Sequence, residues 1–77
     1  MMRRILYETF DRLGVPYTLN EPLTEKDKTI ISEWSDRCVT VRIGTSRIII
    51  GEDDNEKDVI VGVLNDNGSF VKGREFN

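Results

Sequence analysis

Residues 38–71 constrain the fold of this chain more than any other part, because their pattern predicts four strands joined by two tight turns and an acidic loop. Along 39–43, apolar and polar side chains alternate, which is the period of a half-buried strand. Along 59–64, every position except Gly62 is apolar, which is typical of a strand covered on both faces. The rest of the chain is therefore expected to cover a sheet.

The first predicted hairpin turns at Gly44-Thr45, a two-residue loop with glycine at the first central position of a type II′ turn. This turn fixes which residues lie opposite each other, and slipping it by one residue would scramble both faces. The predicted pairs are Ile43 with Ser46, Arg42 with Arg47, Val41 with Ile48, Thr40 with Ile49 and Val39 with Ile50.

The second predicted hairpin turns at residues 65–68, Asn-Asp-Asn-Gly, as a type I turn followed by a left-handed glycine. This register places Leu64 opposite Phe70 and Val63 opposite Val71. The competing two-residue loop at Asn67-Gly68 would place Val63 opposite Lys72, which is a poorer match.

Two helices are predicted before the sheet. Leu6, Phe10 and Leu13 share one stripe of a helix over residues 2–13, which Gly14 ends. Thr24 is a plausible N-cap for a second helix over residues 24–36. Residues 17–19, between the helices, are predicted to be extended.

The predicted fold is therefore α+β, with two N-terminal helices packed on one face of a three- to four-stranded antiparallel meander, in the order ααββββ. A chain of 77 residues predicts a single domain, residues 1–77, with a small core and only marginal stability.

Composition argues against most catalytic chemistry. The chain has no histidine, and its one cysteine, Cys38, is expected to be a small buried hydrophobe. No phosphate-binding loop, zinc cluster or nucleophile–base pair is visible. We therefore expect a non-enzymatic protein without a cofactor or metal site. The single cysteine and the absence of a long apolar run predict a cytoplasmic protein that does not enter a membrane.

Residues 52–58 form an acidic loop that lacks the glycine and glutamate positions of an EF-hand. The simpler interpretation is a solvated loop that discourages edge pairing, and a weak cation site is the alternative.

The sheet provides the one functional lead, because both of its faces are predicted to be apolar. Helices are expected on the face of Val41, which leaves the face of Ile49 open, although the sequence does not decide which face of residues 59–64 meets the helices. Exposed apolar area on a small protein usually marks an interaction surface. Three molecules or segments could pack on this face: the C-terminal tail with Phe76, a second copy of the chain, or a different macromolecule.

The sequence thus predicts a small protein-interaction module that binds another protein, or itself as a homodimer, through the open sheet face. The candidate partner-binding residues are Arg42, Arg47, Ile49, Ile60, Leu64 and Phe70. Short acidic chains of this kind occur among phage and mobile-element proteins that inhibit or regulate host machinery, which is an analogy of size and charge alone.

Arg42 and Arg47 are predicted to lie directly opposite each other, and like charges in such a pair are destabilising. A nearby carboxylate or exposure of both side chains to water would relieve the repulsion. An anionic partner would do so too, which makes a nucleic-acid-binding module with an Arg42/Arg47 basic face the alternative function. The net charge of −3 places this alternative second.

Overall fold

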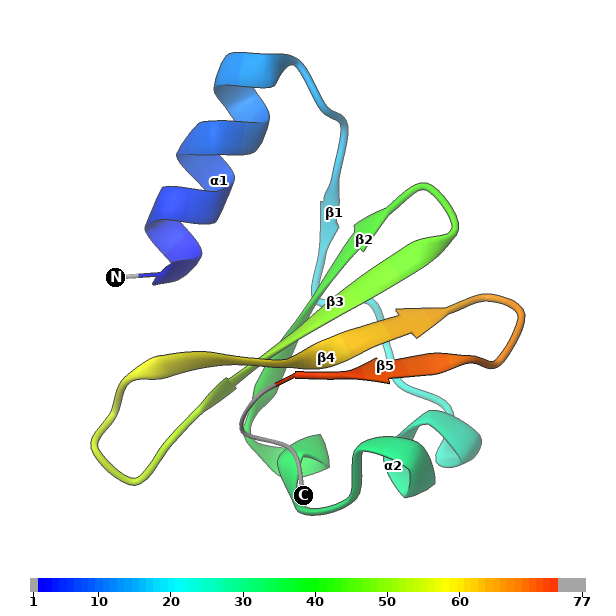
Figure 1. Cartoon of the computed structure of the whole chain (residues 1–77). Coiled ribbons are helices and arrows are strands. Elements are labelled where there is room, and N and C mark those ends of the chain that lie inside the picture. The colour runs from blue at the N-terminus through cyan, green and yellow to red at the C-terminus, as the bar shows by residue number, and fades with distance from the viewer. Residues whose placement is uncertain (1, 74–77) are drawn as a thin grey trace.

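The computed structural model describes residues 2–73 as a five-stranded antiparallel sheet with helical layers on both sides (Figure 1). In chain order the elements are α1 (Met2–Leu13), β1 (Thr18–Leu19), α2 (Glu25–Ile31), the 3₁₀ helix η1 (Ser32–Asp36), β2 (Cys38–Ile43), β3 (Ser46–Glu52), β4 (Asp58–Asn65) and β5 (Phe70–Lys72). The sheet is a meander, β1-β2-β3-β4-β5, and each strand is antiparallel to its neighbours.

Both hairpin registers are as predicted. β2 and β3 pair in the predicted register, including Arg42 opposite Arg47, and Gly44 has the positive φ of 59° that its turn requires. β4 and β5 pair Leu64 with Phe70, and Gly68 adopts a φ of 91° after its turn. Turn chemistry and strand period agree in these two hairpins, so local sequence determines them.

The predicted order ααββββ is wrong in its strand count. Residues 17–19 were expected only to be extended, but Thr18 pairs with Arg42 and Leu19 with Val41, which makes β1 a fifth strand between the two helices. The broad α+β class and the antiparallel sheet are confirmed.

The second helix is shorter than predicted. Thr24 caps it as expected, because the Asp27 N–H donates to Thr24 Oγ1 and the Thr24 N–H donates to Asp27 Oδ2, each at 3.1 Å. The α-helical turns stop at Ile31, since Ser32 has a φ of 58°, and the chain continues to Asp36 as η1.

The helices do not share one face of the sheet, which corrects the expected packing. α2 and η1 cover the Ile49 face, where Ile31, Trp34, Ile49, Val61 and Leu64 form the buried core. α1 lies on the opposite side of the sheet from α2 in Figure 1 and comes closest to β4. It covers the other apolar face, where Val41 and Ile50 are buried.

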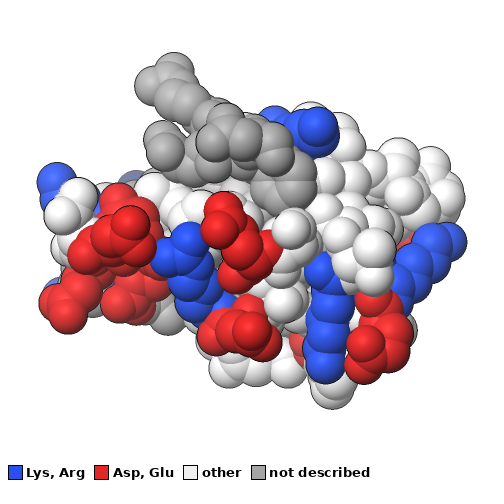
Figure 2. Space-filling view, turned by 90° about the horizontal axis from the view of Figure 1, so that it is seen from below, with Lys and Arg blue, Asp and Glu red and all other residues white. Residues whose placement is uncertain are grey.

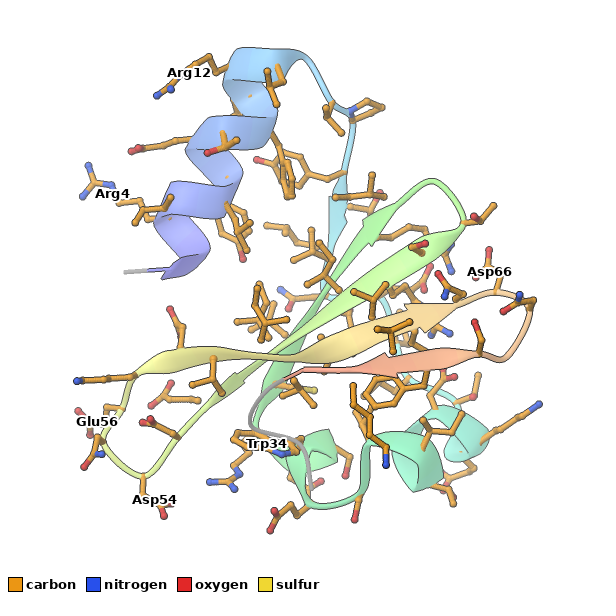
Figure 3. All side chains as sticks on the ribbon, in the orientation of Figure 1. Arg4, Arg12, Trp34, Asp54, Glu56 and Asp66 are labelled. Carbon is orange, nitrogen blue, oxygen red and sulfur yellow. The ribbon has the colours of Figure 1, made fainter. Side chains whose placement is uncertain are left out.

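Two glycines bring aromatic rings onto the backbone of the Ile49 face. A Cβ on Gly51 would collide with the Trp34 ring, and a Cβ on Gly62 would come within 2.5 Å of the Phe70 ring. Both rings therefore pack directly against a strand. Figure 3 shows Trp34 below the sheet. β4 also accommodates an extra residue, Val61, between the positions that pair with Ile49 and Ile50.

This packing predicts that Ile49→Ala destabilises the fold rather than altering a surface. Ile49 is fully buried, so the lost apolar contacts and the cavity should lower the free energy of unfolding by about 2–5 kcal/mol. Urea unfolding followed by Trp34 fluorescence measures this loss. The matched control is Val71→Ala, whose side chain is 61% exposed and whose effect should stay within about 0.5 kcal/mol. Equal losses in the two variants would contradict the placement of Ile49.

Candidate functional site

Arg42, one of the predicted partner-binding residues, is held by two carboxylates. Its Nε and Nη2 donate to Glu21 at 2.6 and 2.9 Å, and its Nη1 and Nη2 donate to Asp66, both at 3.1 Å. The Glu21 and Asp66 carboxylates raise the pKa of Arg42, and the hydrogen bonds from Arg42 lower the pKa values of both carboxyl groups. Arg42 therefore ties the segment before α2 to the β4–β5 turn.

Arg47, the second predicted basic residue, is buried rather than presented to a partner. Its Nη1 and Nη2 donate to the two oxygens of Asp27 at 2.6 and 3.2 Å, and each side chain is only 9% exposed. Its Nε is also buried and lies 3.5 Å from Glu21. The hydrogen bond from Arg47 is the main cause that lowers the pKa of Asp27 to about 2, against the opposing effect of burial.

Three carboxylates, Glu21, Asp27 and Asp66, thus surround the two arginines and relieve the repulsion expected across the hairpin. The basic Arg42/Arg47 face that motivated the nucleic-acid hypothesis is not formed. Figure 2, which views the molecule from below the sheet, shows acidic and basic side chains mixed, with no wide basic area on the visible surface.

The six candidate partner-binding residues do not lie on one open surface. Ile49 and Leu64 are in the core, and Phe70 packs against it. Ile60 is the exception, with 38% of its surface exposed on the α1 face of the sheet. The expectation of an open Ile49 face is wrong because α2 and η1 cover that face. The tail with Phe76, proposed as a cover, lies outside the described residues.

The exposed apolar side chains instead gather on the α1 side of the molecule. On the sheet, Leu19 pairs with Val41, Ile60 with Ile50, and Val71 with Val63, which places all three on the face beneath α1. We call the following five residues the α1 surface. They are Ile5 (62% exposed), Leu13 (69%), Leu19 (40%), Ile60 (38%) and Val71 (61%).

Four of these five residues were not among the predicted site residues. Ile5 and Leu13 were missed because the stripe of α1 was interpreted as core throughout, and Leu19 and Val71 because the other sheet face was expected to be the open one. The available signal was the width of that stripe. Ile5, Thr9 and Leu13, at i, i+4 and i+8, form a flank beside the rest of the stripe, apolar at both ends, and the Thr9 hydroxyl donates to the Ile5 carbonyl oxygen at 2.7 Å. A helix with so wide an apolar arc needs more cover than one sheet supplies.

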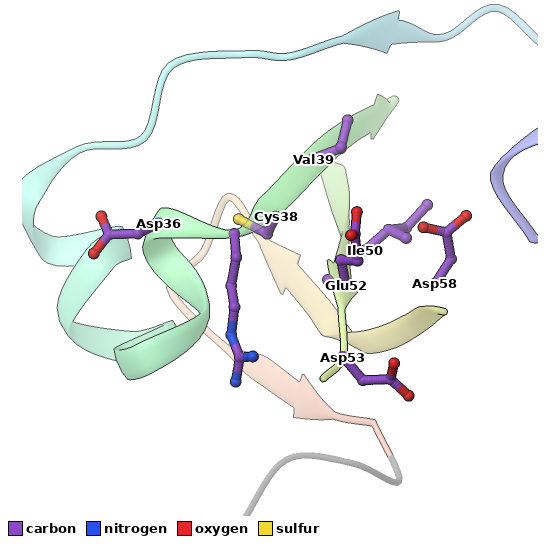
Figure 4. A pocket seen from close by; sticks show the side chains of 9 residues that line it. Asp36, Cys38, Val39, Ile50, Glu52, Asp53 and Asp58 are labelled. Atoms are coloured by element: carbon purple, nitrogen blue, oxygen red, sulfur yellow. The ribbon is translucent and has the colours of Figure 1, made fainter. Parts of the chain in front are cut away.

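A cleft of about 440 Å³ opens where β2 begins and β3 ends (Figure 4). The Arg37 side chain lines this cleft. Its guanidinium carbon lies 4.2 Å from the centroid of the Trp34 ring, and its Nη1 lies 3.3 Å from Asp54 Oδ1. Cys38 also lines the cleft, and burial raises the pKa of its thiol, which keeps it in the weakly nucleophilic protonated form. The carboxylates along its edge are Asp36, Glu52, Asp53 and Asp58.

The acidic loop is organised by its own backbone. Asp53 Oδ1 accepts hydrogen bonds from the N–H groups of Asn55 and Lys57, both at 2.9 Å. Within residues 2–73, no three acidic or cysteine side chains come together as metal ligands would. The same part of the chain contains no helix with the length and apolar character needed to cross a bilayer.

Comparison with known proteins gave no family model, curated protein or solved structure that matches the chain. The functional interpretation therefore rests on the geometry above.

The Asp27–Arg47 pair predicts a loss of stability in acid. Asp27 has a pKa of about 2 in the folded protein, below its ordinary value of 3.8, so the unfolded chain binds the proton more readily. The pair should contribute its full stabilisation above about pH 4 and lose about 2 kcal/mol of it as the pH falls to about 2. Urea unfolding across this pH range measures the loss.

The matched controls are Asp54→Asn and Asp27→Asn. Asp54 is exposed over 97% of its side chain, so its substitution should leave the acid dependence unchanged. Asp27→Asn should lower stability at neutral pH and flatten the acid dependence, because the titrating group is removed. The same slope in Asp27→Asn as in the native chain would contradict the assignment.

Proposed function

We propose that this protein is a non-enzymatic protein-interaction module that binds another protein, or a second copy of itself, through the α1 surface. One observation carries the proposal. Within residues 4–73, every large apolar side chain that is exposed lies on α1 or on the same sheet face as α1. Contiguous exposed apolar area on a small protein usually marks a site of association.

The packing of α1 supports the proposal. None of the described side chains at positions 4–13 is buried, whereas α2 and η1 bury Ile31 and Trp34. α1 therefore packs less tightly on the Val41 face than α2 and η1 pack on the Ile49 face. A partner that covers the α1 surface would remove further apolar area from water, which favours association.

The ion pairs favour this function over nucleic-acid binding. Arg42 and Arg47 already meet carboxylates of the same chain, so a phosphate would have to displace Glu21, Asp27 or Asp66. An inhibitor or regulator of the phage or mobile-element kind would act through the α1 surface by covering part of its target.

We expect Val71→Asp to weaken association about tenfold, because a charge buried within an apolar contact loses its hydration without a partner. The fold should remain intact, since Val71 is 61% exposed. Sedimentation of the purified chain measures self-association, and retention of proteins on the immobilised chain measures binding to others.

Asn55→Asp is the matched control, because it adds the same single charge at an exposed position of the β3–β4 loop. It should associate like the native chain. A native chain that stays monomeric and retains no more protein than Val71→Asp would refute the proposed function.

A further inference from the structure

We propose that a second copy of this chain covers the flank of α1, with the two α1 helices packed side by side and antiparallel. This inference rests on the proposed function and names the partner. Its first support is the flank itself, where Ile5 and Leu13 are 62% and 69% exposed and Thr9 stands between them. Residues at i, i+4 and i+8 form a ridge, and such ridges are the elements that pack two helices together.

A second ridge, formed by Arg4, Glu8 and Arg12, runs beside the first. Arg4 Nε donates to Glu8 Oε1 at 3.1 Å, whereas Arg12 makes no ion pair with any described residue. Figure 3 shows Arg4 and Arg12 projecting from α1 away from the sheet. The charged ridge therefore faces solvent beside the apolar one, and of its three residues Arg12 has no ion pair within the described chain, whereas Glu8 would share its carboxylate between Arg4 and a second cation.

One antiparallel register satisfies both ridges. When the apolar ridges interdigitate, Leu13 of the second copy lies between Ile5 and Thr9. The two-fold axis then passes level with Phe10, and Glu8 of each copy lies level with Arg12 of the other. Because the contact is isologous, this ion pair forms twice. A parallel arrangement would instead place Glu8 beside Glu8 and Arg12 beside Arg12.

The register can be tested by a disulfide at Thr9. The two Thr9 residues are offset by two positions, which is about 3 Å along the helix axis. With helix axes about 8–10 Å apart, their Cβ atoms come within the range that a disulfide spans. We expect Thr9→Cys, in a Cys38→Ala background, to form a covalent dimer under mild oxidation. Thr29→Cys on α2, in the same background, is the control and should stay largely monomeric.

Charge reversal at Glu8 and Arg12 provides the second test. The dissociation constant of the dimer is measured by sedimentation equilibrium. Glu8→Arg and Arg12→Glu alone should each raise this constant about fivefold, since each places like charges level with one another twice. The double variant should return it toward the native value, because the opposite charges face each other again. Because Glu8 and Arg12 also stand four residues apart on the same helix, the helix content of each variant is measured by circular dichroism, and the recovery supports the pair only where the helix content of the single variants is unchanged.

The outcomes separate this inference from the proposed function. Cross-linking at Thr9 with recovery in the double variant supports the antiparallel pair. Association that is abolished by Val71→Asp, without cross-linking at Thr9 or charge recovery, overturns the pair and leaves the proposed function standing. A native chain that is monomeric and binds no protein overturns both.

Discussion

The ion pair between Asp27 and Arg47 is the interaction on which the arrangement of the layers depends. Arg47 is the second residue of β3 and shares a sheet face with the buried Ile49, so burial of its charge without a partner would be strongly unfavourable. Asp27 provides that partner and also caps the first turn of α2 through Thr24. The start of α2 is therefore attached to the Ile49 face.

Once α2 is attached there, the aromatic rings complete that layer. Trp34 lies against Gly51 and Phe70 lies against Gly62, so both contacts depend on the absence of a Cβ on the strand below. Among the residues that the structure describes, α1 is the only helix on the opposite face. Five strands at about 4.8 Å spacing extend over about 19 Å, whereas one helix covers about 10 Å. Exposed apolar residues on the α1 side follow from this mismatch of widths.

The features that the sequence predicted correctly are those that residues close together in the chain determine. The two hairpins follow from strand period and from Gly44 and Gly68 in their turns, and the cap of α2 follows from Thr24. It did not predict which face each helix covers, because both faces of the sheet carry apolar side chains that need cover and the arginines of one face gave no sign that they would be buried. Nor did it predict β1, a strand of two residues, since a pairing so short leaves almost no periodic signal.

The same limit explains the candidate site. Ile49 and Ile60 are both apolar strand residues, and only the position of α2 makes the first a core residue and leaves the second exposed. The position of α2 in turn depends on a contact between residues 20 positions apart, Asp27 and Arg47. Arg47 was expected on an open face of the sheet. It instead pairs with Asp27 of α2, and this pairing holds α2 over that face.

Because α1 is held on the sheet only by partly exposed contacts, binding at the α1 surface and the docking of α1 on the sheet depend on each other. Tyr17 stacks on Tyr7 with ring centroids 5.7 Å apart and lies 5.5 Å from the ring of Phe10, which attaches α1 to the segment before β1. Beyond these partly exposed contacts, α1 has no buried side chain among its described residues to hold it on the sheet. A molecule that covers Ile5 and Leu13 binds only the chain in which α1 is in place, so it stabilises that arrangement by mass action. Burial of the α1 surface would therefore complete the second layer of the fold and form the interface in the same step.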